Sequence, residues 1–471
     1  MTDRYEYKNL VAIVYMSALF IQIMDSTIIN VALPTLADEF TVEATEMDWT
    51  VLSFTLAVAA MTPTAGWFGD RFGLRSTFLA CLSGFVVASV LCGASQSLDQ
   101  LVAARAVQGG FAGMMAPIGT ALLFGAYPIS ERADASRRVI TVVVIAPALG
   151  PIVGGLLLEF TSWRWIFFVN VPMGVGAFAL AATQLRRDEP IDPSAFDLRG
   201  FLLSAAGLSL LVYGLSRGGE LGWGSPQIFG SLLASLVLVV TFAFVELRQT
   251  KPLLSLRLFQ NRLFATVTVL AIPVYAGFIA LIYLLPLLLQ KEAGFSPLRV
   301  GLALASQPVG VLLMTQLTGK ILYKRIGPRR LIAIGSLLAF ASGVVASRFG
   351  SDVSVLLVIV TMLTRGFGMG LVFVPVQSAV YAQIKPRELA HATAIFSTTR
   401  QLAPALGVAI ASSALAVGFA RDVDDAANRV DSYQQAILLT TALFLLGAVL
   451  ALFIRDSDAA ATMEPAKQAG A

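Results

Sequence analysis

Segments of about twenty apolar residues recur along this chain from near Leu10 to near Ile454, about fourteen in number. Each is long enough to cross a hydrocarbon layer roughly 30 Å thick. Lipid offers no partner for backbone polar groups, so segments of this kind must be helices. Only 13% of the 471 residues are charged, whereas soluble domains carry about 25%. The sequence therefore predicts an all-α, polytopic membrane protein with fourteen transmembrane helices.

The loops between these segments alternate in charge. Every second loop is basic, and together these loops hold most of the 33 lysines and arginines. The first loop on the other side is purely acidic, with Asp38, Glu39, Glu43, Glu46 and Asp48. The positive-inside rule then predicts a multi-pass protein of the cytoplasmic (inner) membrane with both termini in the cytoplasm. Because the basic residues are spread over short loops, they report orientation and indicate no nucleic-acid partner.

Two longer polar connections, starting at Arg186 and Glu246, divide the helices into six, two and six. The predicted units are a six-helix bundle over 1–190, two extra helices with linkers over 191–250, a second six-helix bundle over 251–456 and a disordered cytoplasmic tail over 457–471. A weak internal repeat supports two related halves: GWFGDRFGLR follows the second helix, and GKILYKRIGPRR follows the second helix of the later set. Duplicated halves around a central site are typical of secondary transporters. Glycine turns suited to short loops would also produce this repeat.

Four stretches in a fixed order carry a resemblance to a known family. They are GWFGDRFGLR with Gly66, Asp70, Arg71, Gly73 and Arg75, LVAARAVQGG with Arg105, Gln108 and Gly109, ALGPIVGG with Gly150, Pro151, Gly154 and Gly155, and SWRWIFFVNVPMG from Ser162. With these motifs and the six-two-six spacing, nearly the whole chain resembles the fourteen-helix drug:proton antiporters of the major facilitator superfamily. The resemblance implies two six-helix bundles plus two extra central helices.

The chain departs from that family mostly in its second half. The later glycine loop has Lys324 where its acid would repeat, and it is one residue longer between its glycines. An acid-dependent latch is therefore expected in the first half only. The stretch before Gly150 begins with Ala146 where the family usually has glycine, a small-for-small change.

One acid, Asp25, lies in the interior of a predicted span. A charge at this depth costs at least about 2.5–3.5 kcal/mol on insertion scales, and burial disfavours the ionised form. Asp25 is therefore predicted to load and release a proton. Arg105, inside the fourth span, is predicted to sense the charge on Asp25 directly or through water, and the resemblance places a similar arginine near the first helix. A structural Asp25, and an Arg105 that binds backbone carbonyls, are the alternatives.

The fifth span contains a ladder of small residues. Ala146, Gly150 and Gly154 recur every four residues, and Pro147 and Pro151 remove backbone hydrogen bonds between them. This pattern predicts a kinked helix pressed against a neighbour. The resemblance implies that the stretch, through Gly155, belongs to exporters and seals the transport path against leak. Helix packing alone would select the same residues.

The loop from Gly66 to Arg75 lies on the predicted cytoplasmic side. Its Asp70 could cap the start of a helix in the opposite half, an attraction worth about 0.3–1 kcal/mol when exposed. The resemblance implies that Gly66, Asp70, Arg71, Gly73 and Arg75 form a latch for the outward-open form. The alternative is a turn that is polar and charged only because it lies on the cytoplasmic side of the membrane.

Polar side chains within the spans are candidates for a substrate cavity. Gln22, one turn before Asp25, Gln108 and Gln307 are the predicted lining residues. Arg365 and Arg400, in helices of the second half, are interpreted first as structural. His391, the only histidine, titrates in a range suited to a pH sensor, but its charged neighbours favour an ordinary residue at the rim.

The sequence has no P-loop, zinc-ligand spacing or GxSxG elbow, so we expect no catalytic residue, metal or cofactor, and a proton gradient as the energy source. The leading hypothesis is a proton-coupled antiporter that exports lipophilic, often cationic, drugs or toxic compounds by alternating access. In it, a proton on Asp25 and the substrate compete for the central cavity. Export of a metabolite or siderophore, import, and a non-transporting sensor or scaffold are the alternatives. The expected partners are a small-molecule substrate, protons and the lipid bilayer, with the chain as a monomer.

Overall fold

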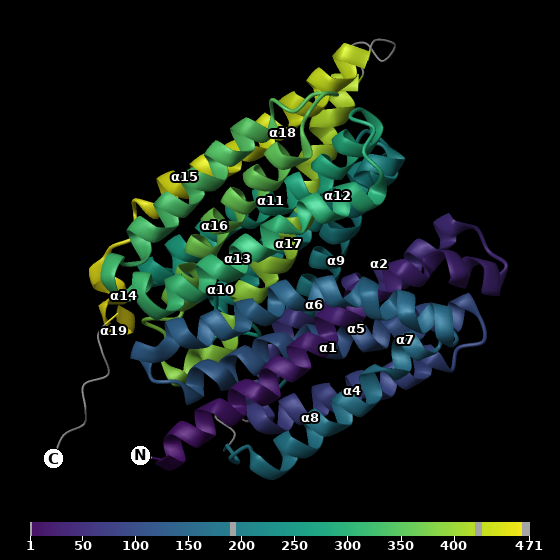
Figure 1. Cartoon of the computed structure of the whole chain (residues 1–471). Helices are drawn as coiled ribbons and strands as arrows, with labels where there is room; N and C mark the ends of the chain where they lie inside the picture. Colours follow the sequence, from purple (N-terminus) through teal and green to yellow (C-terminus); the bar gives the residue numbers. More distant parts are fainter. Residues whose placement is uncertain (1, 189–194, 420–425, 464–471) are drawn as a thin grey trace.

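Fourteen helices long and apolar enough to cross a membrane run through the described part of the chain, as the sequence predicts. The computed structural model describes residues 2–188, 195–419 and 426–463. The first and last described helices, α1 and α19, lie at the same end of the molecule (Figure 1). We call this end the terminus side and the opposite end the far side. The protein is therefore a multi-pass membrane protein.

The first six spans form one bundle. Asp25 lies in the part of its first helix nearer the far side, and every following span reverses direction. The elements are α1 (Thr2–Phe40), α2 (Ala44–Met61), η1 (Thr62–Thr64), α3 (Ala65–Phe72), α4 (Leu74–Gly93), α5 (Leu98–Ala126), η2 (Ile129–Glu131), α6 (Arg132–Phe160), α7 (Trp165–Phe168) and α8 (Asn170–Gln184).

The last six spans form the second bundle, drawn in green to yellow in Figure 1. Its elements are η3 (Leu256–Gln260), α11 (Arg262–Lys291), α12 (Pro297–Leu304), α13 (Ser306–Leu317), η4 (Thr318–Leu322), α14 (Tyr323–Ile326), α15 (Pro328–Ala346), α16 (Val355–Ala379), η5 (Pro386–Glu388), α17 (Leu389–Phe419), α18 (Ala426–Ala451), η6 (Asp456–Ala459) and α19 (Ala460–Met463).

The two extra spans, α9 (Leu198–Leu221) and α10 (Pro226–Arg248), form a helical hairpin at the junction of the bundles. Helix α9 contacts α2 of the first bundle, where Ser209 Oγ donates to the carbonyl of Leu56 (3.3 Å) and Arg217 pairs with Asp48 (3.1 Å). It also contacts α17 of the second bundle, with Gly219 facing Ser412. The hairpin therefore covers one seam between the bundles.

The two glycine loops adopt the same conformation in both halves. Gly73 and Gly327 have φ values of +81° and +83°, which side chains with a Cβ rarely adopt. A carboxylate that follows the last span of the same half then caps the next helix: Asp188 accepts from the backbone N–H of Arg75 (3.1 Å), and Asp456 accepts from that of Arg329 (3.0 Å). This equivalence extends the sequence repeat to three dimensions.

The extra residue of the second glycine loop lies in a π-helical turn, η4. The two glycines are seven positions apart in the first half, from Gly66 to Gly73, and eight apart in the second, from Gly319 to Gly327. A π-turn closes its hydrogen bond over one more residue than an α-turn. The insertion is thus absorbed inside the helix, and Gly327 keeps the conformation of Gly73.

The tail differs in part from the prediction of a disordered segment over 457–471. Residues 456–463 are helical, and Thr462 is buried, with its hydroxyl 2.7 Å from that of Tyr323. Asp456 is held at the start of α15 by its capping bond, which anchors this segment. Residues 464–471 lie outside the described part of the chain.

Candidate functional site

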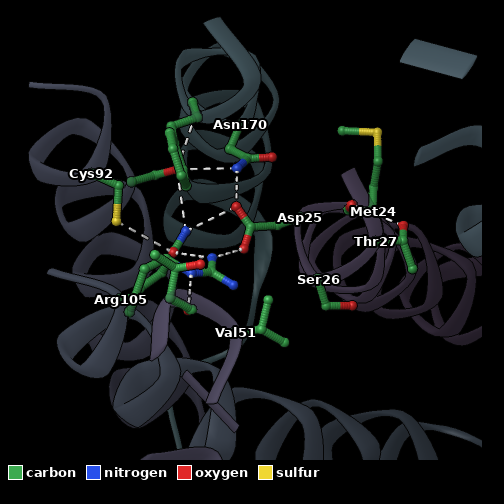
Figure 2. A network of polar contacts seen from close by, with 12 residues as sticks. Met24, Asp25, Ser26, Thr27, Val51, Cys92, Arg105 and Asn170 are labelled. Carbon is green, nitrogen blue, oxygen red and sulfur yellow. Dashed lines mark hydrogen bonds and ion pairs between the residues drawn. The ribbon is translucent and has the colours of Figure 1, made fainter. Parts of the chain in front are cut away.

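The carboxylate of Asp25 is the centre of a buried polar network inside the first bundle (Figure 2). Arg105 of α5 donates from Nη1 to Asp25 Oδ2 (2.6 Å). The other carboxylate oxygen, Oδ1, accepts from Gln108 Nε2 (3.0 Å) and from Asn170 Nδ2 (2.6 Å). Asp25, Arg105, Gln108 and Asn170 are all fully buried. Charged and amide groups from two other helices therefore surround the Asp25 carboxylate, and both of its oxygens accept hydrogen bonds.

The bonds around this centre fix Arg105 and the two amides. Arg105 Nε donates to the carbonyl of Thr50 in α2 (3.2 Å), and its guanidinium carbon lies 4.3 Å from the centroid of the Phe54 ring. Ser89 of α4 accepts from Gln108 Nε2 (3.2 Å) and from Asn170 Nδ2 (3.0 Å). Five helices of the first bundle, α1, α2, α4, α5 and α8, thus contribute to one network.

The predicted contact between Arg105 and Asp25 is direct in this structure. Close packing of α5 on α2 positions Arg105 for this contact. A Cβ on Gly109 would lie 2.3 Å from the Phe54 carbonyl oxygen of α2, so the two helices touch through their backbones there. The proton-handling role that the sequence suggests for the pair stays a prediction.

On its opposite face, α1 packs against the small-residue ladder of α6. Figure 2 shows Thr27 pointing away from Asp25. A Cβ on Gly150 would lie 2.1 Å from Thr27 Oγ1, and one on Gly154 would lie 2.9 Å from Ile28. Helix α6 is continuous through Pro147 and Pro151. Gly155, by contrast, has open space where a Cβ would stand, among the described residues.

A cavity of about 570 Å³ lies between the bundles. Helix α6 of the first bundle forms one wall, and helices of the second bundle form the rest. The wall is mainly apolar, with three side chains that carry amide or charged groups, Gln307, Gln377 and Arg400. Such a volume falls in the range of about 300–1,000 Å³ typical of sites for drug-sized ligands.

Of the three residues predicted to line the cavity, the structure places one in its wall. Gln307 lies in the cavity wall, nearly buried, and its Nε2 has no hydrogen-bond partner in the described structure. Gln108 does not line the cavity, because its side-chain amide is hydrogen-bonded to Arg105 and Asp25. Gln22 is half-buried and also lies outside the cavity wall. The prediction that Asp25 and substrate share the cavity is wrong for this conformation, since Asp25 is fully buried beyond the wall formed by α6.

Hydrogen bonds between the bundles cluster on the terminus side. Asp70 Oδ2 lies 3.0 Å from His391 Nε2 of α17. Because His391 Nδ1 accepts from the backbone N–H of Ser255 (3.4 Å), Nε2 is the nitrogen that donates to Asp70. Asp70 therefore lies at the start of a helix of the opposite half, as predicted, but in the described structure it contacts a side chain there rather than the backbone N–H groups. His391, interpreted as a rim residue, bridges the two bundles.

Other residues of the glycine loop support this contact. A Cβ on Gly66 would lie 2.5 Å from the His391 ring, so only glycine admits the imidazole. Arg75 Nη2 donates to the carbonyl of Ala182 (2.5 Å) and so ties α4 to α8. Further bonds between the bundles on this side join Ser136 to Ser378 (2.9 Å), Thr141 to Gln316 (3.1 Å) and Thr62 to Gln401 (3.0 Å).

A family model described as Major Facilitator Superfamily matches residues 15–408 and again residues 267–470. The chain belongs to the major facilitator superfamily. The overlapping second match fits the internal repeat of this facilitator, because the glycine loops of both halves share one geometry.

Relatives of this facilitator, about one-third identical to it, include proteins named for drug export and for resistance. The Multidrug export protein EmrB of Escherichia coli (strain K12) is 33% identical over 411 residues, covering 84% of this chain and 78% of that protein. The Fatty acid resistance protein FarB of Neisseria gonorrhoeae is 33% identical over 404 residues, with the same coverage. A Multidrug resistance protein B homolog of Mycobacterium tuberculosis (strain ATCC 25618 / H37Rv) is 32% identical over 411 residues, covering 84% and 74%.

Two solved structures show the same fold at low identity. The human organic anion transporter MFSD10 (TETRAN) aligns with a TM-score of 0.66 at 17% identity, covering 94% of this chain and 99% of that one. The proton:xylose symporter XylE aligns with a TM-score of 0.64 at 14% identity, covering 95% of each chain. Both support the major facilitator fold.

For three residues of the site and the cavity, the sequence predicts no functional role. Asn170 lies in the family stretch from Ser162 and Ser89 in none of the four family stretches, and nothing in their spacing links either residue to Asp25. Arg400 stands in a helix and is interpreted as structural, yet it lines the cavity. The available signal was the arginine itself, since an ionisable residue inside a span is a functional candidate by default.

Proposed function

We propose that this facilitator is a proton-coupled exporter of lipophilic compounds that works by alternating access. The observation that carries the proposal is the fully buried pair of Asp25 and Arg105. Buried ion pairs are weak sources of stability, because well-packed apolar residues often do as well. An ion pair retained inside a membrane protein therefore supports a working role, and binding a proton is a reaction that the carboxylate of such a pair can perform there.

The packing of α1 suggests how protonation would reach the cavity. A proton on Asp25 removes the charge that Arg105 holds, so the bond between α1 and α5 weakens. Two residues along, Thr27 packs on Gly150 of α6, and α6 carries Val143 and Pro147 in the cavity wall. We infer that proton and substrate are coupled through movement of α1 against α6, without sharing one binding place.

The relatives support the export direction and the breadth of substrates. EmrB and the Multidrug resistance protein B homolog are named for drug export and resistance, and FarB is named for resistance to fatty acids. The apolar wall of the cavity accepts varied lipophilic shapes. We further propose that the terminus side faces the cytoplasm of an inner membrane, because the basic loops lie there, and that the chain works as a monomer.

The test is gradient-driven transport by protein reconstituted in liposomes. An imposed proton gradient should drive uptake of lipophilic dyes by the wild type, and Asp25→Asn should abolish it. The matched control is Asp99→Asn, which makes the same change at an exposed position at the far-side start of α5. Proton-driven transport that survives Asp25→Asn would refute the proposal.

A further inference from the structure

Among the described residues that line the cavity, Arg400 is the one with a charged side chain. No aspartate or glutamate is among the described residues that line the wall. Arg400 lies twelve residues into α17, well inside the span that runs from Pro386 to Phe419. The electrostatic character of the cavity is therefore set by a single cation.

Arg400 differs from the two fully buried arginines within the spans, Arg105 and Arg365, in making no hydrogen bond to the described residues. Arg105 is paired with Asp25, and Arg365 donates to the carbonyl of Gly277 (2.8 Å). Across the described structure, Arg400 makes no ion pair or hydrogen bond, although it is not exposed. An unpaired cation in an apolar setting is costly, and the cost is relieved when an anion binds.

Phenols, not carboxylates, lie within the electrostatic reach of Arg400 among the described groups. The charge acts on the phenols of Tyr15, Tyr275 and Tyr381. Burial raises the pKa of Tyr381 well above its usual range, so this phenol supplies no negative charge. Of the three, Tyr275 lines the cavity, and a neutral phenol cannot neutralise Arg400.

The rest of the wall fits an amphiphile with one polar end. Two side-chain amides, Gln307 and Gln377, are nearly buried in the wall, and Gln307 Nε2 has no acceptor among the described residues. The rings of Tyr275 and Phe373 stack 5.3 Å apart with an interplanar angle of 12°, and Phe278 meets Phe373 edge-on. The cavity thus combines hydrogen-bond donors and one cation with an aromatic and aliphatic wall.

We propose that the cavity selects lipophilic anions, compounds with a carboxylate on an apolar body, and that Arg400 binds the carboxylate. The inference rests on the proposed export function and narrows its substrate class. It reverses the expectation of cationic substrates, because a cation in this cavity would meet Arg400 and no acid. Guanidinium groups bind carboxylates through two parallel hydrogen bonds, which a point charge such as lysine cannot reproduce.

The test measures binding, which requires no turnover. Three fluorescent probes share one body: 11-(dansylamino)undecanoate, its methyl ester, and the analogue with a terminal ammonium. Each is titrated into protein in nanodiscs of zwitterionic lipid, with empty discs subtracted. The wild type should bind the carboxylate about tenfold or more tighter than the ester, as expected for a hydrogen-bonded charge pair, and bind the ammonium more weakly still.

Variants of Arg400 and of one neighbour in the same segment then test whether Arg400 causes the preference for the carboxylate. Arg400→Gln should bring carboxylate affinity to that of the ester and leave ester binding unchanged, whereas Arg400→Lys should keep part of the preference. Arg387→Gln removes the same charge from an exposed position of the same segment and should behave as wild type. If Arg400→Gln binds the ester, the variant is folded. If Arg400→Gln does not fold, the carboxylate preference of Arg400→Lys is compared with that of the wild type instead.

Two results would overturn the inference: equal wild-type affinity for carboxylate and ester, or a carboxylate preference that persists in Arg400→Gln. Either can occur while proton-driven transport is intact, so the exporter proposal would stand. Conversely, if Asp25→Asn leaves transport unaffected but the carboxylate preference is present, the coupling proposal fails and the anion site stands.

Discussion

At the scale of single residues, the Asp25 network couples charge to fold stability. Arg105 is the only cation in contact with the Asp25 carboxylate among the described residues. Removing one partner of a buried pair leaves an uncompensated charge, whereas removing both leaves none.

We therefore expect Arg105→Met to destabilise the protein by about 3–5 kcal/mol, and the double variant Arg105→Met with Asp25→Leu to recover a large part of that loss. Thermal unfolding of purified protein in one detergent would measure both. A double variant as unstable as the sum of its single variants would show that the two side chains do not interact energetically.

The amide neighbours of Asp25 can be examined separately. Asn170→Ala removes one donor from Asp25 Oδ1 while Gln108 remains, and a hydrogen bond to a charged group is worth about 1.5–3 kcal/mol. We expect slower proton-driven transport with the protein still folded, checked by transport in liposomes beside size-exclusion profiles. Asn170→Asp, which would place a second carboxylate beside the first, should impair the protein more, and the opposite order would contradict this geometry.

At the scale of helices, the contact between α1 and α6 is a place where a single methyl group decides packing. Glycine-to-alanine changes in helices normally stabilise by roughly 1 kcal/mol. At Gly150 the added Cβ would collide with Thr27, and at Gly155 it would meet open space.

Gly150→Ala is expected to lose most transport because α1 is pushed away from α6, and Gly155→Ala should transport like the wild type. The two variants change the same residue type in the same helix, so they control for helix propensity. Transport rates normalised to the amount of protein in the liposomes give the comparison. Equal rates would mean that close contact between α1 and α6 is not needed.

The π-turn η4 offers a second prediction at this scale. Deleting Ile321, a half-exposed residue of the turn, should turn it into an ordinary α-helical turn and leave the second bundle folded. Deleting Trp67 from α3, which has no extra residue, should instead displace Gly73 and disrupt the first loop. Yield of monodisperse protein after extraction would distinguish the two, and equal tolerance would contradict the role assigned to the turn.

At the scale of the whole molecule, side-chain bonds on the terminus side hold the two bundles together. Asp70 with His391 is one of these bonds. Others join Arg132 to the carbonyl of Tyr381, Arg137 to Gln316 and Ser136 to Ser378. Loss of one such bond should therefore shift the balance of states without unfolding either bundle.

We expect His391→Ala and Asp70→Ala to increase access to the cavity from the terminus side. A cysteine introduced at Gln307, with Cys81 and Cys92 replaced by alanine, would report this access through labelling by a membrane-impermeant maleimide. Glu6→Ala, an exposed acid on the same side, is the control. Unchanged labelling in both variants would argue that the contact between Asp70 and His391 does not hold the bundles closed.

The sequence predicts the architecture well because membrane spans are recognisable from their length and apolar composition, and the family motifs indicate how the spans are arranged along the chain. It also singles out Asp25 and Arg105, since ionisable residues are rare within spans. It does not predict which polar faces meet. The rotation of each helix decides that Gln108 turns to Asp25 rather than to the cavity, and that His391 reaches Asp70, and rotation depends on packing against neighbours distant in the chain.

The hairpin of α9 and α10 makes the two flanks of the carrier unequal. The hairpin bridges α2 of the first bundle and α17 of the second, while the seam formed by α6 and α13 has no such helical cover in the described structure. The cavity borders that second seam, since its wall includes residues of both α6 and α13. The carrier is therefore asymmetric in the membrane plane: the hairpin separates one flank from the surrounding bilayer, whereas the flank beside the cavity has no such cover among the described residues.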